Sequence, residues 1–532
     1  MTTLVPRPPY TPEELRALYP SGLRLELVQV LLRHGERSPV STRFRNAGLP
    51  AYWPYCAAAR HLSNAIMTEK DASRWDKVEW RRRLETFGRD DGPVIATGPR
   101  AEVDSICNLG ELTDKGRQTT LALGQRLRHL YVDQLGYMPK LIADADMIYL
   151  RATPIPRALE SVQQSFWGMY PPSARTMDFP TPTIVTRTPA EETLYPNDGN
   201  CRRLSQLSSA FAQRTADRWN QSSEMDYLHH LMGKWMASGQ RVAIDAHPRL
   251  SGVMDTVNST LAHGPETRLP REFYDAKGRD TMERIEMEEW FSGYRESVEY
   301  RKLGIGSLMG DVVSRMVGSV EGNGSDGLEE IGGDDQHPGL GRGGEQRIKF
   351  AMAGCHDTTL AAVLGSLGAL DAEKARWPPY TSHIAVELFR AHDATLPTPQ
   401  PARAEAMISD GGAGDVTGRE RSLWQSLVDR VVGRSALQPG AVGIGRQPLS
   451  GLPPAEQAVL DGYFVRLRYN DAPIVVPGCQ TRGKHLEGDE SFCTLAAFKN
   501  IVDKYTPRNW KQECGSNLDQ PPFPPAVEPA GI

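Results

Sequence analysis

The chain has 532 residues, of which 39% are hydrophobic and 24% are charged, and its formal net charge is −5 at pH 7. This composition is typical of a globular protein and gives no sign of nucleic-acid binding, although a basic pocket can lie within an acidic whole. No run of about 18 apolar residues occurs, so no membrane span is expected.

The N-terminal segment, residues 1–20, lacks the apolar core of a secretory signal and contains Glu13 and Glu14, so no signal peptide is predicted. Acidic residues are also rare in mitochondrial targeting segments. A cytoplasmic location is therefore expected, with a mitochondrial one as the alternative. Seven widely scattered cysteines predict no dense disulfide framework, and the sequence leaves open whether Cys479, Cys493 and Cys514 form bridges.

Three short apolar runs are each followed at once by a cluster of polar residues. Short runs rich in Val, Ile, Leu and Tyr predict buried strands. The runs cover residues 25–32 (LELVQVLL), 147–150 (MIYL) and 350–353 (FAMA). The clusters that follow them are Arg33-His34-Gly35-Glu36-Arg37-Ser38-Pro39, Arg151-Ala152-Thr153 with Arg157, and Gly354-Cys355-His356-Asp357.

Helical patterns follow these strands. Residues 113–130 place leucines near one face behind a candidate N-cap at Thr113, and residues 358–367 also predict a helix. The alternation of strand, loop and helix predicts an α/β fold with a mostly parallel sheet. Ligands bind outside the carboxyl ends of the strands in such sheets, so we expect the three polar clusters to converge.

The chain is predicted to divide into six parts. These are an N-terminal extension (1–22), two parts of an α/β core (23–170 and 346–395), a mainly helical inserted cap (171–345), a low-order insertion (396–452), and the C-terminal part of the core with the tail (453–532). The Gly- and acid-rich stretch 318–344 predicts a flexible loop, and 423–432 predicts a short helix. Residues 80–83 (WRRR) are interpreted as the solvated face of a helix, with a basic substrate entrance as the alternative.

The first cluster has the residue types that phosphoryl transfer to a protein side chain requires. A neutral imidazole can attack phosphorus and hold the phosphoryl group covalently, which makes His34 the candidate nucleophile. Arg33 and Arg37 can each donate to two phosphate oxygens, and their charge disfavours a charged imidazole. An isolated Arg-His pair is more often loop polarity, but the position after a buried strand, repeated in the other clusters, favours a site.

The other two clusters supply the remaining groups of a phosphate site. Asp357 can protonate the leaving alkoxide and then activate water. His356 can donate a hydrogen bond to a phosphate oxygen, and Arg157 can supply a third guanidinium group. This chemistry requires no metal or cofactor, and none is predicted.

Other polar residues are interpreted as structural. The spacing of Asp245, His247 and Asp255 matches no metal-binding motif. Cys355, inside a predicted strand, is expected to be a small buried hydrophobe. Glu387 ends an apolar segment and is expected to orient a neighbour.

These motifs resemble those of the histidine acid phosphatase family, the RHGxRxP branch of the histidine phosphatase superfamily. The resemblance covers most of the chain and includes residues 110–116 (GELTDKG) and 378–388 (PPYTSHIAVEL). It implies a three-layer α/β sandwich of the phosphoglycerate mutase type with an inserted helical cap. It also implies the roles of the site residues, namely His34 as nucleophile, Asp357 as proton donor, phosphate binding by Arg33, Arg37, Arg157 and His356, and support by Arg151.

The resemblance implies an acid phosphatase that hydrolyses small phosphate monoesters through a phosphohistidine intermediate, with lysophosphatidate among the candidate substrates. The alternative is a phytase, which would need a strongly basic pocket, whereas a lysolipid enzyme needs an apolar groove beside the arginines. A phosphomutase is disfavoured by the Arg-x-Pro that follows His34 and Gly35. A phospho-ligand-binding pseudophosphatase is disfavoured because every expected catalytic residue type is present. The oligomeric state stays open.

Overall fold

The computed structural model describes residues 8–237, 239–322, 348–370, 376–392 and 443–532. The strands are β1 (Leu23–Arg33), β2 (Leu62–Met67), β3 (Trp75–Trp80), β4 (Glu85–Phe87), β5 (Pro93–Ile95), β6 (Ile148–Ala152), β7 (Ile184–Val185), β8 (Phe350–Cys355), β9 (His383–Ala391), β10 (Tyr463–Tyr469), β11 (Ala472–Ile474), β12 (His485–Leu486) and β13 (Asp489–Thr494). The helices are α1 (Pro12–Leu18), α2 (Asp114–Arg128), α3 (Pro156–Met169), α4 (Arg202–Trp219), α5 (Ser223–Met232), α6 (Leu250–Ala262), α7 (Ala276–Glu296), α8 (Val298–Arg301), α9 (Ser307–Glu321), α10 (Asp357–Ser366), α12 (Pro454–Gln457), α13 (Leu495–Asp503) and α14 (Trp510–Glu513).

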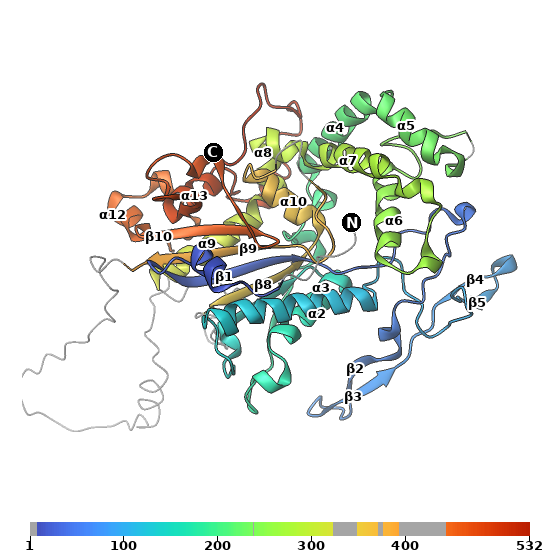
Figure 1. The fold of residues 1–532 in the computed structure, drawn as a ribbon, viewed down its shortest axis with the longest axis horizontal. Helices are drawn as coiled ribbons and strands as arrows, with labels where there is room; N and C mark the ends of the chain where they lie inside the picture. Colours follow the sequence, from blue (N-terminus) through green and yellow to red (C-terminus); the bar gives the residue numbers. More distant parts are fainter. Residues whose placement is uncertain (1–7, 238, 323–347, 371–375, 393–442) are drawn as a thin grey trace, which may run out of the picture.

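One large sheet forms the centre of the fold (Figure 1), with the strand order β12-β13-β10-β9-β1-β8-β6-β7 and β11 beside β10. The pairs β1–β8, β8–β6 and β6–β7 are parallel, whereas β9 to β13 pair antiparallel, including β9 with β1. The expected α/β fold is confirmed, and all three predicted strands lie in its parallel part. Because β8 lies between β1 and β6, the three polar clusters leave the sheet at the same end.

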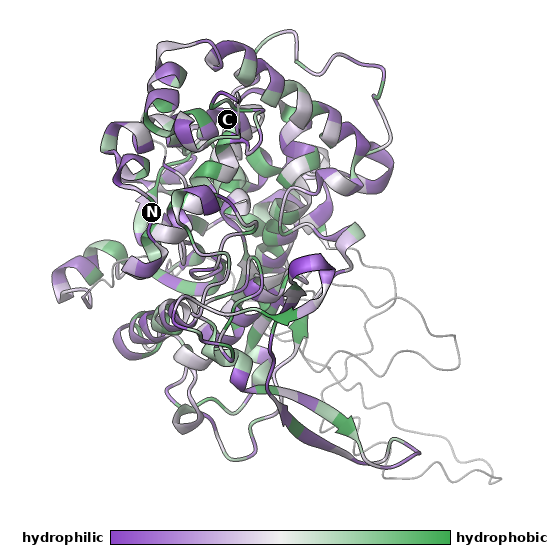
Figure 2. Cartoon of the chain, turned by 90° about the vertical axis from the view of Figure 1, so that its right-hand side faces the viewer, coloured by the Kyte–Doolittle hydropathy of each residue, from purple (hydrophilic) through white to green (hydrophobic). Residues whose placement is uncertain are grey.

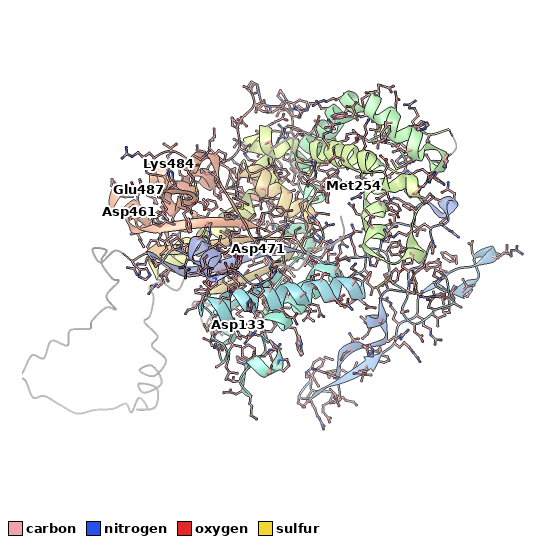
Figure 3. The ribbon with its side chains drawn as sticks, viewed as in Figure 1. Asp133, Met254, Asp461, Asp471, Lys484 and Glu487 are labelled. Atoms are coloured by element: carbon pink, nitrogen blue, oxygen red, sulfur yellow. A yellow bond between two sulfur atoms is a disulfide. The ribbon has the colours of Figure 1, made fainter. Side chains whose placement is uncertain are left out.

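The central strand β1 is buried on both faces, as is usual for strands in the parallel part of a sheet. Leu27 and Leu31 belong to a hydrophobic cluster with residues of α9, α10 and α13. Val28 and Val30 belong to a second cluster with residues of α2 and α3. Helices therefore cover both faces and give three layers. In Figure 3, Asp133 marks the layer that contains α2.

The predicted helices that follow the strands are confirmed. Thr113 is the N-cap of α2, because its side chain accepts a hydrogen bond from the backbone N–H of Gly116. Helix α10 begins at Asp357, directly after β8. Both helices therefore start beside the end of the sheet from which the polar clusters emerge.

Helices α4 to α8 lie within the predicted cap, and Figure 3 labels Met254 on α6. Helix α9 also falls within the predicted range 171–345, and it packs on the central sheet. Gln29 of β1 donates to the carbonyl of Val312 over 3.0 Å and accepts from Arg315 over 2.8 Å. The apolar face of α9 is needed to cover β1, so α9 belongs to a layer of the core.

Two predicted features fall largely outside the described residues. Most of the loop predicted at 318–344 and the whole helix predicted at 423–432 lie there. Of the insertion predicted at 396–452, the structure describes 443–452, which form short 3-10 turns against the core. Within the described part of the chain, no helix is both long and apolar enough to cross a membrane.

Two β-ribbons, β2–β3 and β4–β5, project from the body of the molecule (Figure 2). Trp80 is the last residue of β3 and pairs with Leu62, so the interpretation of residues 80–83 as a helix face is wrong. Residues 75–80 (WDKVEW) contain two tryptophans and a valine, residue types that are enriched in strands. Arg82 then pairs with Glu111 over 2.8 Å.

Six of the seven cysteines form disulfide bonds. The pairs are Cys56–Cys107, Cys201–Cys514 and Cys479–Cys493. The open question about the C-terminal cysteines is thereby answered, and the Cys201–Cys514 bond connects the start of α4 to the C-terminal tail. Cys355 is buried in β8 without a disulfide partner, as expected.

Candidate active site

His34 follows β1 directly and is fixed by backbone contacts on both sides. Its N–H donates to the carbonyl of Cys355, and its carbonyl accepts from Thr381 N–H. The next residue, Gly35, packs against the first turn of α2, where a Cβ would lie 2.3 Å from the carbonyl oxygen of Gly116. Only glycine permits this approach, which explains both Gly35 and the Gly116 of the GELTDKG segment.

The His34 ring is held in the form that can act as a nucleophile. Its Nδ1 lies 2.8 Å from the Gly35 carbonyl, which can only accept, so Nδ1 carries the proton and Nε2 keeps its lone pair. Burial, together with the charges of Arg157 and Arg33, lowers the pKa of His34 well below its ordinary value. The imidazole is therefore neutral at mildly acidic pH.

Three arginines surround His34, and each has donors that the protein does not satisfy. Arg33 donates to the carbonyl of Pro378, and Arg37 donates to the carbonyl of Ser38 over 3.1 Å. Arg157 lies at the start of α3, 3.4 Å from the carbonyl of Gly110. The Nε atoms of all three are buried and have no hydrogen-bond partner. Unsatisfied cationic donors of this kind are suited to an anion.

His356 is the N-cap of α10 and stands edge-on to the His34 ring, with 5.4 Å between ring centroids. Its Nε2 lies 3.1 Å from Thr153 Oγ1, which connects the third polar cluster to the second. Burial and the charge of Arg157 lower the pKa of His356 to about 3. His356 is therefore also neutral near pH 5.

Asp357 lies at the first turn of α10 and contacts two side chains. Its Oδ2 is 2.6 Å from Nη2 of Arg33 and accepts from Trp377 Nε1–H over 2.9 Å. Burial raises the pKa of this carboxyl, but Arg33 and the indole donor outweigh burial and hold that pKa below its ordinary value. Asp357 is thus a carboxylate before a substrate anion arrives.

A cavity of about 400 Å³ opens over these groups. It is lined by His34, Arg37, Arg157, His356 and Asp357, so five of the six predicted site residues meet at one cavity. Arg33 does not line it and instead lies behind Asp357, with its guanidinium 4.2 Å from the ring centre of Tyr380. The remaining wall has polar residues, such as Ser208, Ser209 and Thr358, and five aromatic side chains, namely Tyr195, Trp290, Phe291, Tyr294 and Tyr300.

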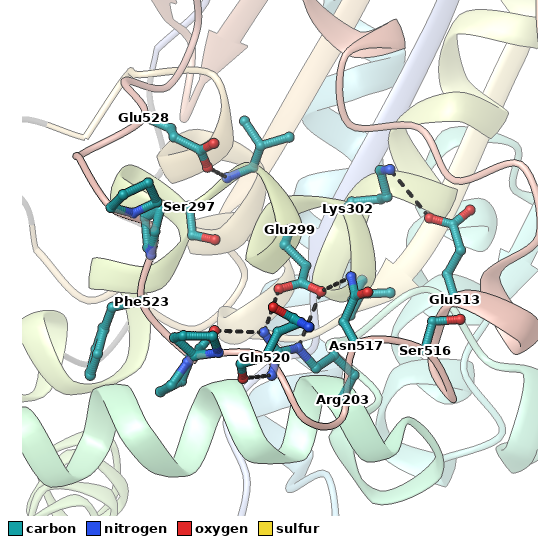
Figure 4. A pocket seen from close by; sticks show the side chains of 16 residues that line it. Arg203, Ser297, Glu299, Lys302, Glu513, Ser516, Asn517, Gln520, Phe523 and Glu528 are labelled. Atoms are coloured by element: carbon teal, nitrogen blue, oxygen red, sulfur yellow. Dashed lines mark hydrogen bonds and ion pairs between the residues drawn. The ribbon is translucent and has the colours of Figure 1, made fainter.

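Another cavity lies on the far side of α4, where the C-terminal tail crosses α4 and α8 (Figure 4). Its charged side chains are already paired within the protein. Arg203 binds Glu299 over 2.8 Å, and Lys302 binds Glu513 over 3.3 Å. This cavity therefore offers few free charged groups to a ligand, and the cavity over His34 is the better candidate for a reaction site.

The polar residues that were interpreted as structural or supporting form contacts within the protein. Asp245 accepts from Asn220 Nδ2 over 2.9 Å, and Asp255 pairs with Arg37 over 2.7 Å. Arg151 is buried, forms an ion pair with Glu192 over 2.7 Å and does not line the cavity. The supporting role expected for it stays a prediction. Glu387 is fully buried, where it binds Arg466 and Arg468.

The sequence interpretation missed several residues that shape the site. Trp377 and Tyr380 flank Pro378 and Pro379, which lie in the segment 378–388 that was noted only for the resemblance. Tyr195 lies in residues 194–197 (LYPN). Asp255 was considered only as a metal ligand. No local pattern marks these residues, because each reaches the site from a different element.

The chain is similar to several known proteins. A sequence model described as "Histidine phosphatase superfamily (branch 2)" matches residues 24–398. A probable acid phosphatase of Schizosaccharomyces pombe is 34% identical over 502 residues, covering 93% of this chain and 95% of the relative. Human lysophosphatidic acid phosphatase type 6 is 22% identical over 380 residues, covering 70% of this chain and 75% of that protein. The structure of Hafnia alvei phytase aligns with 93% of this chain and 99% of that one at 12% identity, with a TM-score of 0.49.

Proposed function

Because the chain belongs to the histidine phosphatase superfamily, branch 2, and is an acid phosphatase of that family, we propose that it acts through a covalent phosphohistidine on His34. The observation that carries this proposal is the His34 ring. Its Nδ1–H is held on the Gly35 carbonyl, and its free Nε2 belongs to a ring that lines the same cavity as Arg37 and Arg157.

The reaction proceeds in two steps. Nε2 of His34 attacks phosphorus, the ester P–O bond breaks, and Asp357 gives its proton to the leaving alkoxide. Asp357, now a carboxylate, takes a proton from water, which attacks the phosphohistidine and releases inorganic phosphate and neutral His34. Arg37, Arg157 and His356 hold the phosphate oxygens through both steps.

Asp357 has to carry a proton in the first step although its pKa is low in the empty site. A bound phosphate monoester brings negative charge next to Arg33 and Arg37, which otherwise stabilise the carboxylate. That charge raises the pKa of Asp357. Low pH favours the same protonated form, while His34 and His356 stay neutral because their pKa values are depressed. This combination supports an acidic pH optimum.

The cavity wall favours a substrate with one phosphate and an apolar body. Beyond the phosphate-binding groups, the wall has five aromatic side chains, while its charged members are Asp198, Glu289 and Arg249. Arg249 binds Glu289 and has little free charge to offer a second phosphate. The phytase alternative needs a strongly basic pocket, so we favour aryl or acyl-chain monoesters, with lysophosphatidate as one candidate.

The cytoplasmic location expected from the N-terminal segment stays a prediction. The three disulfides support an oxidising compartment instead, because cytosolic thiols are kept reduced.

The test is phosphate release at about pH 5–6 from lysophosphatidate, phytate, a sugar phosphate and an aryl phosphate. Wild type is compared with His34→Ala and with His230→Ala, which changes an exposed histidine of α5. We expect His34→Ala to lose at least about 10³-fold in kcat, as expected for removal of a nucleophile, and His230→Ala to be unchanged. Wild-type enzyme quenched during turnover should carry an alkali-stable, acid-labile phosphoryl group.

Substantial activity in His34→Ala would contradict the nucleophile assignment. Phytate as the preferred substrate would contradict the substrate class. A folded wild type that is silent on every substrate would favour the pseudophosphatase instead.

A further inference from the structure

We propose that Asp255 of α6 is a positioning residue that holds the Arg37 guanidinium in the orientation needed for phosphate. This inference rests on the proposed function. Asp255 Oδ1 lies 2.7 Å from Nη2 of Arg37, and both side chains are largely buried. Nη1 of Arg37 donates to the Ser38 carbonyl, so two of the three guanidinium nitrogens are held by the protein.

The same carboxylate also holds the loop that follows Arg37. Its Oδ2 accepts from the backbone N–H of Val40 over 3.3 Å and lies 3.4 Å from Nη1 of Arg43. Gly252 of α6 leaves room for the Arg43 side chain, because a Cβ there would lie 2.9 Å from Arg43 Nε. One cap side chain therefore contacts three successive parts of the loop after the nucleophile.

Asp255 affects the reaction through Arg37, because it does not line the cavity over His34. Burial disfavours the Arg37 cation, but Asp255 outweighs burial and raises the pKa of Arg37. Arg157 donates to the carbonyl of Gly110 over 3.4 Å, and its pKa is lowered to about 10 by burial and by the charge of Arg37. The carboxylate thus compensates one of the three cations that surround a neutral histidine.

Kinetics of four variants test the role: Asp255→Asn, Asp255→Ala, Arg37→Ala and the double variant Arg37→Ala/Asp255→Ala. We expect Asp255→Ala to lower kcat/KM by about 10- to 100-fold, because small misplacements of a binding group reduce rates by such factors. Inhibition by orthovanadate, which takes the geometry of the transferring phosphoryl group, should weaken in parallel. Asp255→Asn, which keeps the shape, should lose less than Asp255→Ala.

The double variant separates positioning from a general effect on the fold. Asp255→Ala should have no further effect on kcat/KM once Arg37 is alanine, because the carboxylate then has no phosphate-binding guanidinium to orient. Additive losses would overturn the proposal. Glu296→Ala is the matched control, since it removes a comparably buried cap carboxylate from Arg214, away from the site, and should leave the kinetics unchanged.

The outcomes also separate this inference from the proposed function. Wild type without phosphatase activity would refute the function. An active wild type in which Arg37→Ala is impaired while both Asp255 variants behave like Glu296→Ala would refute only the positioning role. If Asp255→Ala does not fold, Asp255→Asn decides: a loss of orthovanadate inhibition supports the role, and wild-type inhibition contradicts it.

Discussion

The indole of Trp377 donates its Nε1–H to Oδ2 of Asp357 over 2.9 Å, on the same oxygen that Arg33 contacts. This hydrogen bond stabilises the carboxylate and so helps to hold the pKa of Asp357 low. It comes from the segment before β9, which also places Tyr380 against Arg33. The pKa of the proposed proton donor is therefore tuned by a residue from the segment between its own helix, α10, and β9.

Trp377→Phe should move the alkaline limb of the kcat/KM profile to higher pH by about one unit. Loss of the donor raises the pKa of Asp357, so the protonated form persists to higher pH. Profiles of wild type and variant on one aryl phosphate measure the shift. Trp167→Phe, at an exposed site on α3, is the control. An unshifted or acid-shifted limb in Trp377→Phe would show that the indole does not tune this carboxyl.

Asp357→Asn should slow alkyl phosphates by about 10²–10⁴-fold and activated aryl phosphates much less. The alkoxide leaving group needs a proton, whereas an activated phenolate leaves without one. Rates on a series of leaving groups measure the difference. Asp198→Asn, a carboxyl on the same cavity wall, is the control. Equal losses across the series would argue against proton donation by Asp357.

Glu387→Gln should lower the free energy of unfolding by about 3–5 kcal/mol at pH 7, because it leaves Arg466 and Arg468 buried without their counter-charge. Burial raises the pKa of Glu387, but Arg468 and Arg466 lower it to about 2. Its stabilisation is complete above the unfolded pKa of about 4.5 and is lost as pH falls towards 2. The difference between wild type and variant should shrink over that range.

Urea unfolding at several pH values measures this difference. Glu296→Gln removes the charge of a more exposed ion pair and should cost less than about 1 kcal/mol. A Glu387→Gln penalty no larger than that of Glu296→Gln would mean that the buried ion pairs add nothing to stability.

Alkylation should modify one cysteine in unfolded, unreduced protein and all seven after reduction, as read by intact mass. Reduction should also lower stability, since loss of one native disulfide typically costs about 2–5 kcal/mol. Seven modified cysteines without reductant, in protein alkylated at cell lysis, would contradict both the disulfides and the proposed oxidising compartment.

The strands and the main site residues were predictable because their signals are local. An apolar run followed by Arg33-His34-Gly35 marks both a buried strand and its functional end within a few residues. Asp255 and Trp377 carry no such signal, because their roles arise from contacts with segments far away in the sequence. Residues 80–83 were wrongly interpreted as a helix face, because a short run of arginines shows no hydrophobic periodicity that distinguishes a helix from a strand or loop.

The Cys201–Cys514 bond has a consequence for biosynthesis. Arg203, the second residue of α4, also donates to the carbonyls of Gln520 and Pro521. On the ribosome, α4 is made long before these partners, so its contacts with the tail form only after the tail emerges. A chain stalled within the last part of its synthesis would carry every predicted site residue and still lack the disulfide that holds α4 to the tail.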